Sequence, residues 1–243
     1  MTSPGAGASP PAPDTDTPAA DPGARRPTGT AHGSGPTDGR VEVLVGGIVV
    51  ALTVLAALWL RHHPGPVVLD RWGSSLVHPS LHSRFWRRVT DLRSIPVLVG
   101  GSVLAAVVVV TRDRWRAVAC LVAPTMAVAM TEYVLKPVVG RRYAEVLSFP
   151  SGTTTVVGSV ATAWVLAAPR LIRPAVATVA AIAVVLECMA VVALQWHYPS
   201  DAVAGAAFGA GFVVLVDGVL HLGAGHAPAR QGADALSGGS PTR

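Results

Sequence analysis

Apolar residues along this chain gather into six long runs, which short polar or charged connections separate. Each run comes close to the ~20 residues that a helix needs to cross the ~30 Å hydrocarbon core of a membrane. The runs cover residues 42–60, 94–111, 115–135, 151–168, 174–194 and 202–222. The pattern predicts an all-α fold, an integral membrane bundle of about six transmembrane helices, with five or seven spans as alternatives.

The two ends of the chain have a different composition. Residues 1–40 and 223–243 are rich in Pro, Gly, Ser and Thr and hold almost no large apolar side chain. Such segments bury too little surface to offset the entropy lost on ordering. We therefore predict a disordered Pro/Gly-rich tail over 1–40, a six-helix membrane domain over 41–222 and a second disordered tail over 223–243.

The longest connection between apolar runs is 61–93, and it carries histidines, arginines and the aromatic stretch 84–88. Trp and Arg anchor helices at the headgroup level, so this stretch predicts a helix lying at the membrane interface. With an even number of spans both tails lie on one side, together with ten arginines. The other side holds eight arginines and Lys136, so the counts are nearly equal. If Lys136, Arg141 and Arg142 serve chemistry, the positive-inside rule favours cytoplasmic tails, and we expect the plasma membrane of a bacterium.

Composition and charge narrow the class of protein further. The chain is 51% hydrophobic and 14% charged, with a mean hydropathy of +0.48, whereas an ordinary soluble domain carries about 25% charged residues. The formal net charge is +5, but the arginines are scattered, so no nucleic-acid partner is expected. Cys120 and Cys188 lie inside apolar runs without metal-ligand spacing, so we expect no disulfide, metal or cofactor.

Polar residues at the ends of membrane spans are costly and need an explanation. One stretch runs from Glu132 through Lys136, the only lysine of the chain, and continues to Pro-Ser-Gly at 150–152. A second holds His197 and Asp201. With six spans, both stretches emerge on the same membrane face, so they should meet in space.

The residue types in these stretches suit an anion. Lys136 and the neighbouring arginines supply positive charge, and a helix that starts at Pro-Ser-Gly presents backbone N–H groups to phosphate oxygens. His197 is a candidate nucleophile. Asp201, one helical turn later, could hold the imidazole in one tautomer. Together they predict a phosphate site, although each alone is also compatible with a headgroup anchor or an ordinary loop.

At these residues the chain resembles the type 2 phosphatidic acid phosphatases, the membrane branch of a superfamily that includes vanadium haloperoxidases. The family pattern consists of KxxxxxxRP, PSGH and SRxxxxxHxxxD. The matching positions are Lys136, then Pro150-Ser151-Gly152, then His197 and Asp201. The resemblance covers roughly residues 41–222 and keeps the motifs in the family's order.

The resemblance implies a phosphoric ester or anhydride hydrolase acting on lipid phosphates or isoprenyl diphosphates, with membrane lipids as its surroundings and no cofactor. It implies that His197 attacks phosphorus and forms a phosphohistidine, and that Asp201 orients this histidine. The positions it assigns to phosphate binding are Lys136, Arg141, Arg142, Ser151 and Gly152.

Three positions depart from the family pattern. Tyr143 stands where the first motif has Arg, Thr153 replaces the histidine that protonates the leaving group, and Ala190-Val191 replaces Ser-Arg. Losing a general acid typically removes 10²–10⁴-fold of rate. We therefore expect diphosphates, which are better leaving groups, to be preferred over phosphatidate, and His78 or His82 is a candidate substitute acid.

Two other classes of function stay open at this point. One is a catalytically impaired relative that binds lipid phosphate without turnover, which Thr153 and Val191 favour. The other is a transporter or channel that uses the intramembrane acids Glu132, Glu187 and Asp217. Glu132 stands one turn before Lys136 and is most simply its ion-pair partner.

Overall fold

The computed structural model describes residues 36–79 and 83–225, and these form helices with one small hairpin. The predicted tails lie for the most part outside the described residues. In chain order the elements are α1 (Pro36–His62), α2 (Val68–Leu76), α3 (Arg84–Val89), η1 (Thr90–Arg93), α4 (Ile95–Val109), α5 (Arg114–Met130), η2 (Thr131–Leu135), α6 (Lys136–Val139), β1 (Arg142–Tyr143), β2 (Val146–Leu147), α7 (Gly152–Ala167), α8 (Arg173–Ala193) and α9 (Pro199–Gly225).

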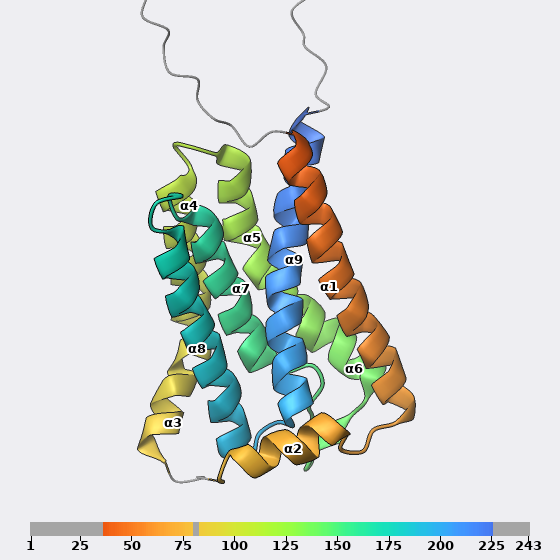
Figure 1. The fold of residues 1–243 in the computed structure, drawn as a ribbon. Helices are drawn as coiled ribbons and strands as arrows, with labels where there is room; N and C mark the ends of the chain where they lie inside the picture. Colours follow the sequence, from red (N-terminus) through yellow and green to blue (C-terminus); the bar gives the residue numbers. More distant parts are fainter. Residues whose placement is uncertain (1–35, 80–82, 226–243) are drawn as a thin grey trace, which may run out of the picture. The chain divides into compact units, whose positions relative to one another are not determined.

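Each of the six apolar runs forms a helix, and these helices, α1, α4, α5, α7, α8 and α9, lie side by side (Figure 1). Four stretches are long and apolar enough to span a membrane. They are Gly39–His62, Arg114–Val139, Arg173–Ala193 and Pro199–Ala224. The α3–η1 segment and α4 qualify only as one span bent by 50°, and α7 has 16 residues. The described residues thus hold four or five candidate spans, and the number six is not confirmed.

The outer surfaces of these helices are apolar. Large side chains such as Leu52 and Leu55 on α1 and Val179 and Ile182 on α8 are more than half exposed. In a soluble protein an apolar surface of this extent would be an aggregation liability, whereas a lipid-facing helix requires it. The described helices are therefore compatible with an integral membrane protein.

Helix α9 packs against α1, α5 and α7, and small residues allow the close approach. A Cβ at Gly46 of α1 would lie 2.5 Å from the backbone nitrogen of Leu215, and a Cβ at Gly158 of α7 would lie 2.5 Å from the carbonyl oxygen of Ala206. At Gly205 a Cβ would overlap the carbonyl oxygen of Ser151. Glycine at these positions lets backbones touch, which fixes the start of α7 against the start of α9.

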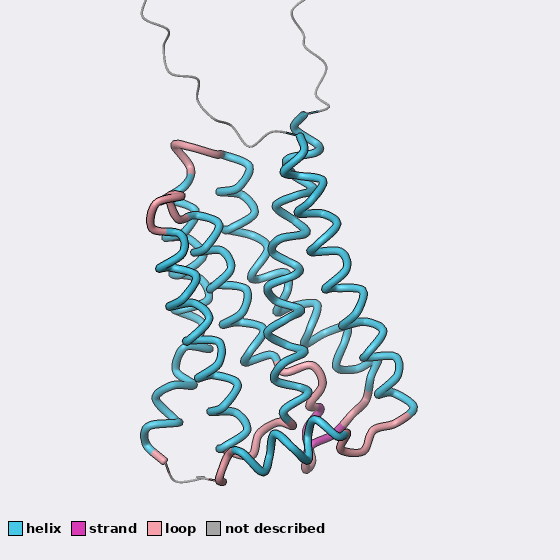
Figure 2. The backbone as a smooth tube through the Cα atoms, viewed as in Figure 1, coloured by secondary structure: helices cyan, strands magenta, loops and turns pink. Residues whose placement is uncertain are grey.

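One end of the helix bundle carries most of the irregular structure. Helix α5 continues through the π-helical turn η2 into α6, which ends at Gly140 with a left-handed φ of 68°. The hairpin β1–β2 follows, with Arg142 paired to Leu147 and Tyr143 to Val146. Figure 2 shows this hairpin and the surrounding loops at the end across which α2 lies. The polar motifs of the sequence fall on these segments.

Candidate functional site

A polar cavity of about 420 Å³ opens at this end of the bundle. Five segments form it: η1, the η2–α6 turn, the hairpin, the start of α7 and the loop between α8 and α9. Its lining residues are Arg93, Glu132, Lys136, Tyr143, Ala144, Val146, Leu147, Thr153, Gln195, Trp196 and His197. The structure therefore brings Lys136 and His197 to one cavity, although about sixty residues separate them in sequence.

Lys136 is held by a carboxylate one turn before it. Its ammonium nitrogen donates to both carboxylate oxygens of Glu132, at 2.7 and 2.8 Å. The lysine side chain is 14% exposed and that of Glu132 is 39% exposed. The ion pair that the sequence suggested is thus present, and it lies at the cavity with its carboxylate accessible to water.

Gly152, the first residue of α7, lies directly beside this ion pair. A Cβ at Gly152 would overlap Oε1 of Glu132 and would lie 3.5 Å from Nζ of Lys136. The preceding residue, Ser151, is buried, and its hydroxyl oxygen accepts a hydrogen bond from the backbone N–H of Thr154. Ser151 therefore acts as the N-cap of α7, while Gly152 provides room for an anionic group at the positive end of that helix.

His197 lies in the loop that precedes α9 and is only 9% exposed. Its Nδ1 atom lies 4.0 Å from Oδ2 of Asp201, longer than a hydrogen bond, and is buried without a hydrogen-bond partner among the described residues. Burial lowers the pKa of His197 to about 4, and the charge of Lys136 acts in the same direction. The imidazole is therefore neutral at neutral pH, the state in which it can act as a nucleophile.

Asp201 is fully buried and belongs to an ion-pair network centred on Arg141. The Arg141 guanidinium donates from Nη1 to Oδ1 of Asp201 and from Nη2 to Oδ2 of Asp70, each at 2.6 Å. Burial alone would raise the pKa of Asp70, but hydrogen bonds from Ser200 and Arg141 lower it below its ordinary value. This network ties α2, the residues after α6 and the start of α9 together.

The other donors of the Arg141 guanidinium also have protein partners. Its remaining donors bond to Ser200 and to the carbonyl oxygens of Pro64 and Gly65. All five guanidinium N–H groups thus have protein partners, and the side chain has no exposed surface. No donor of Arg141 is left for a ligand in this arrangement, so phosphate binding by Arg141 stays a prediction that these contacts do not support.

The neighbouring arginine does not line the cavity either. Arg142 is exposed on β1, and its Nη1 donates to the carbonyl oxygen of Glu145 within the hairpin. Successive side chains of a strand point to opposite faces, so Tyr143 turns toward the cavity while Arg142 turns away. The ring of Tyr143 packs edge-on against Tyr198, with centroids 4.6 Å apart. Arg142 therefore does not take the place of the family arginine in the cavity lining, and its part in phosphate binding stays a prediction.

The arginine that lines the cavity is Arg93, which the sequence did not single out. Arg93, at the end of η1, stacks on the ring of Trp196 at 4.8 Å from the centroid. Its charge contributes to the lowered pKa of His197. The signal in the sequence was weak, since Arg93 is one of several arginines in the 61–93 connection. Arg93 thus gives the cavity a second positive charge, from a segment that none of the three family motifs includes.

The residues that depart from the family motifs, and the histidines considered as substitute acids, can be located relative to the cavity. Thr153 lines the cavity and is 8% exposed. Val191 is fully buried in α8, and Glu187, one turn before it, is buried with both carboxylate oxygens lacking a partner among the described residues. His78 is exposed and lies outside the cavity lining, and His82 lies outside the described residues.

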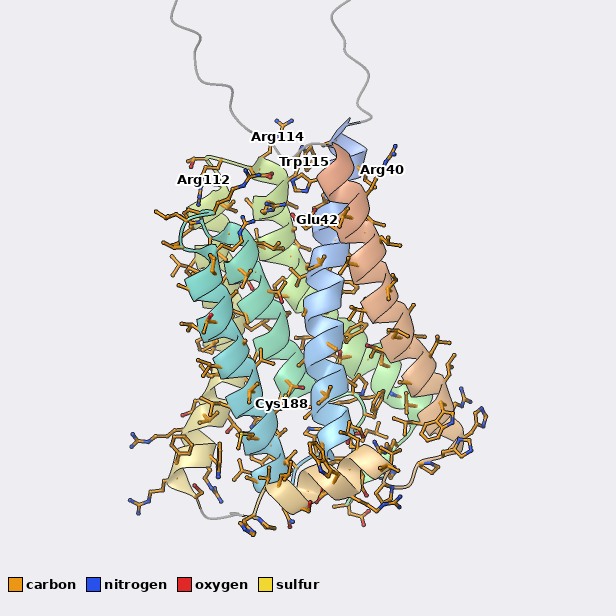
Figure 3. All side chains as sticks on the ribbon, viewed as in Figure 1. Arg40, Glu42, Arg112, Arg114, Trp115 and Cys188 are labelled. Carbon is orange, nitrogen blue, oxygen red and sulfur yellow. The ribbon has the colours of Figure 1, made fainter. Side chains whose placement is uncertain are left out.

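A separate cluster of possible metal ligands lies at the opposite end of the bundle. Ligand atoms of Glu42, Asp217 and His221 lie within 4.8 Å of one another. Figure 3 labels Glu42 near the end of α1 that lies away from α2. Arg116 already pairs with both acids at 2.9 Å, and His221 contacts Asp113 at 2.8 Å. The arrangement is that of a salt-bridge network between α1, α5 and α9.

Comparison with known proteins gives a single result. Neither the curated proteins nor the solved structures provide a match to this chain. The family model described as the PAP2 superfamily matches residues 58–219, well over half of the chain and all of the cavity described above. This chain belongs to the PAP2 superfamily, the family of type 2 phosphatidic acid phosphatases.

Proposed function

We propose that the protein is a membrane phosphatase that hydrolyses lipid phosphates or isoprenyl diphosphates in the polar cavity, with His197 as the nucleophile. The observation that carries this proposal is the meeting of a neutral, buried imidazole with Lys136 and Arg93 in one cavity. A phosphoryl group bound by two cations would lie beside a nitrogen lone pair, which is the arrangement that phosphoryl transfer through a covalent intermediate needs.

In this proposal Nε2 of His197 attacks phosphorus, because Nδ1 is buried on the side of Asp201. The phosphohistidine that forms carries positive charge on its ring, and the carboxylate of Asp201 at 4.0 Å stabilises that charge. Arg141 does not touch substrate. It holds Asp201 in place through its buried ion pair, so it is a positioning residue.

Phosphate binding falls to Lys136, Arg93 and the backbone at the start of α7. Gly152 keeps the space in front of this helix end free of a side chain, and the helix dipole favours an anion there. In the described structure the carboxylate of Glu132 occupies this space. A substrate phosphate therefore has to compete with Glu132 for Lys136.

The proposed substrate class rests on the surroundings of the cavity. A second hollow of about 420 Å³, lined by apolar residues, lies between α4, α7 and α8 and includes Leu92 and Val157. Leu92 directly precedes Arg93, and Val157 follows Thr153 by one turn of α7. A lipid chain in this hollow would place its phosphate at the polar cavity. The arginine distribution supports a cavity on the extracytoplasmic face and cytoplasmic tails.

A phosphate-release assay on detergent-purified protein tests the proposal. Wild type is expected to release phosphate from an isoprenyl diphosphate faster than from phosphatidate, because the diphosphate leaving group needs less protonation. His197→Ala is expected to abolish release, whereas His62→Ala, an exposed histidine at the end of α1, is expected to leave it unchanged. Release that survives in His197→Ala would overturn the proposed mechanism.

A second candidate function is phosphate binding without turnover. It is favoured by Thr153 and Val191 at two positions where the family has chemically active side chains. The double variant Thr153→His, Val191→Arg discriminates the two candidates. Turnover that is present only in this variant would assign the natural chain to binding, and turnover in the wild type would assign it to catalysis.

A further inference from the structure

The cavity contains one carboxyl group among its lining residues, that of Glu132, and the proposed function gives it no role beyond pairing with Lys136. Hydrolysis of an alkyl phosphate also requires a proton on the departing oxygen, since an alkoxide is a very poor leaving group. The chemistry of the cavity therefore poses the question of which side chain supplies that proton. The following inference rests on the proposed function.

Most of the other polar groups that line the cavity cannot supply it. The Thr153 hydroxyl is far too weak an acid. Burial and the neighbouring Tyr198 raise the pKa of Tyr143 above its ordinary value, so the phenol is poorly suited as well. Arg93 does not give up a proton under any physiological condition, and His197 is consumed as the nucleophile.

Glu132 has the position that the task requires. Its Oε1 atom lies against the backbone of Gly152, the residue directly before Thr153. Its carboxylate bonds to Lys136, one of the cations that the substrate phosphate would engage. The side chain is 39% exposed, which leaves it in contact with the water that must deliver and remove protons.

Binding of a substrate phosphate changes the surroundings of this carboxylate in a defined way. The phosphate takes over the ammonium group of Lys136, so Glu132 loses its counter-charge and gains an anion as its neighbour. Both changes favour the neutral, protonated carboxyl, by the same electrostatics that makes one of two adjacent carboxylates keep its proton. The substrate thereby converts Glu132 into an acid at the moment when an acid is needed.

We propose that Glu132 is the general acid and base of this enzyme. In the first step a lone pair of His197 Nε2 forms a bond to phosphorus, the bond from phosphorus to the leaving oxygen breaks, and that oxygen takes the proton of the Glu132 carboxyl. In the second step the Glu132 carboxylate removes a proton from water, the resulting oxygen attacks phosphorus, and the phosphorus–nitrogen bond breaks. Inorganic phosphate leaves, and His197 is again a neutral imidazole. Glu132 returns to solvent the proton that it took up from solvent when substrate bound, and its carboxylate pairs with Lys136 again.

Leaving-group dependence tests this role directly. Purified wild type and Glu132→Gln are assayed with octyl phosphate, whose alkoxide needs a proton, and with p-nitrophenyl phosphate, whose phenolate does not. In single-turnover experiments the rate of leaving-group release by the variant is expected to fall about 10²–10⁴-fold on octyl phosphate and to stay within roughly one order of magnitude on p-nitrophenyl phosphate. Steady-state turnover falls on both substrates, because the variant also lacks the base that hydrolyses their common phosphohistidine. Glu145→Gln, an exposed glutamate of the hairpin turn, serves as the matched control and is expected to behave as wild type on both.

The outcomes separate this inference from the proposed function. An equal loss of the single-turnover release rate on both substrates would overturn the acid role and leave Glu132 as a group that only positions Lys136. Unchanged turnover of octyl phosphate in Glu132→Gln would overturn it as well. If wild type hydrolyses neither substrate, or if His197→Ala hydrolyses both, the proposed function itself fails, and the inference fails with it.

Discussion

The guanidinium of Arg141 and the carboxylate of Asp201 form a fully buried ion pair, with 2.6 Å between Nη1 and Oδ1. The two residues are 60 positions apart in sequence. Their contact joins the segment that follows α6 to the first turn of α9. Lys136 is the first residue of α6, and His197 lies just before α9. The distance between Lys136 and the proposed nucleophile His197 therefore depends on this buried ion pair.

Replacing Arg141 by Gln should destabilise the protein strongly. The change leaves Asp70 and Asp201 as buried carboxylates without their cation, and breaking a buried pair in this way costs about 3–5 kcal/mol. We expect a lower midpoint of thermal unfolding in detergent. Arg142→Gln, which removes the exposed neighbour, is the matched control and should leave the midpoint close to that of wild type. Equal midpoints for the two variants would contradict the structural role of Arg141.

The close contact between α7 and α9 yields a second prediction. In Gly205→Ala the new Cβ would overlap the carbonyl oxygen of Ser151, so the starts of the two helices must move apart. We expect loss of both stability and phosphate release. Gly100→Ala offers the control, because a Cβ at Gly100 meets nothing within 4 Å and alanine favours the helix. Unfolding midpoints and phosphate release of the two variants provide the comparison, and equal behaviour would count against the contact.

Arg93 should matter for substrate binding although no motif contains it. A hydrogen bond to a charged group contributes about 1.5–3 kcal/mol, so Arg93→Gln is expected to raise KM by about tenfold or more. Turnover should fall less than KM rises if the arginine acts before the chemical step. Arg88→Gln changes an exposed arginine of α3 outside the cavity and should leave KM unchanged. A KM for Arg93→Gln equal to that of wild type would remove Arg93 from the site.

The protonation of His197 can be measured in the protein without substrate. Burial, together with Lys136, lowers its pKa to about 4, so nuclear magnetic resonance of histidine-labelled protein should show one imidazole that stays neutral through pH 5. The spectrum of His197→Ala identifies that signal. Lys136→Met should move its titration upward, because the repelling charge is gone. A titration near pH 6.5 in wild type would contradict the burial that the proposal requires.

The lowered pKa of His197 also predicts how the free energy of unfolding changes with pH. Because the pKa in the folded protein lies below the value of 6.5 for an ordinary histidine, neutral His197 contributes fully to stability above pH 6.5. The contribution is lost as the pH falls from 6.5 to about 4, since the unfolded chain then binds a proton that the folded protein does not. His197→Ala should remove this part of the acid sensitivity.

The helices, and the meeting of Lys136 and His197 on one face, could be predicted from the sequence. Apolar runs of near-membrane length predict helices, and each run forms one. The number of spans was less certain, because α7 has 16 residues and α4 meets the length requirement only with the bent segment before it. Lys136 and His197 could be placed on one face because successive spans alternate in direction, and both line the cavity.

The individual roles at the site could not be predicted, because they depend on side-chain direction. Arg141 and Arg142 are adjacent and chemically identical, yet one lies in a buried ion pair and the other lies exposed on a strand. The chain reverses direction at Gly140, just before the two arginines, through a left-handed backbone that a pattern of charges does not reveal. Arg93 comes from a bend between α3 and α4, and nothing in its local sequence distinguishes it from the headgroup-anchoring arginines nearby.

Trapping the covalent intermediate tests the account most directly. Purified protein is mixed with substrate that carries ³²P in its terminal phosphate, quenched in alkali within the first turnover, and analysed for label on the protein. We predict a label that is stable to alkali and lost in acid, as a phosphohistidine is. We also predict that His197→Ala carries none, whereas His62→Ala carries as much as wild type. An equal label on His197→Ala, or phosphate release by wild type without any trapped label, would contradict a covalent role for His197.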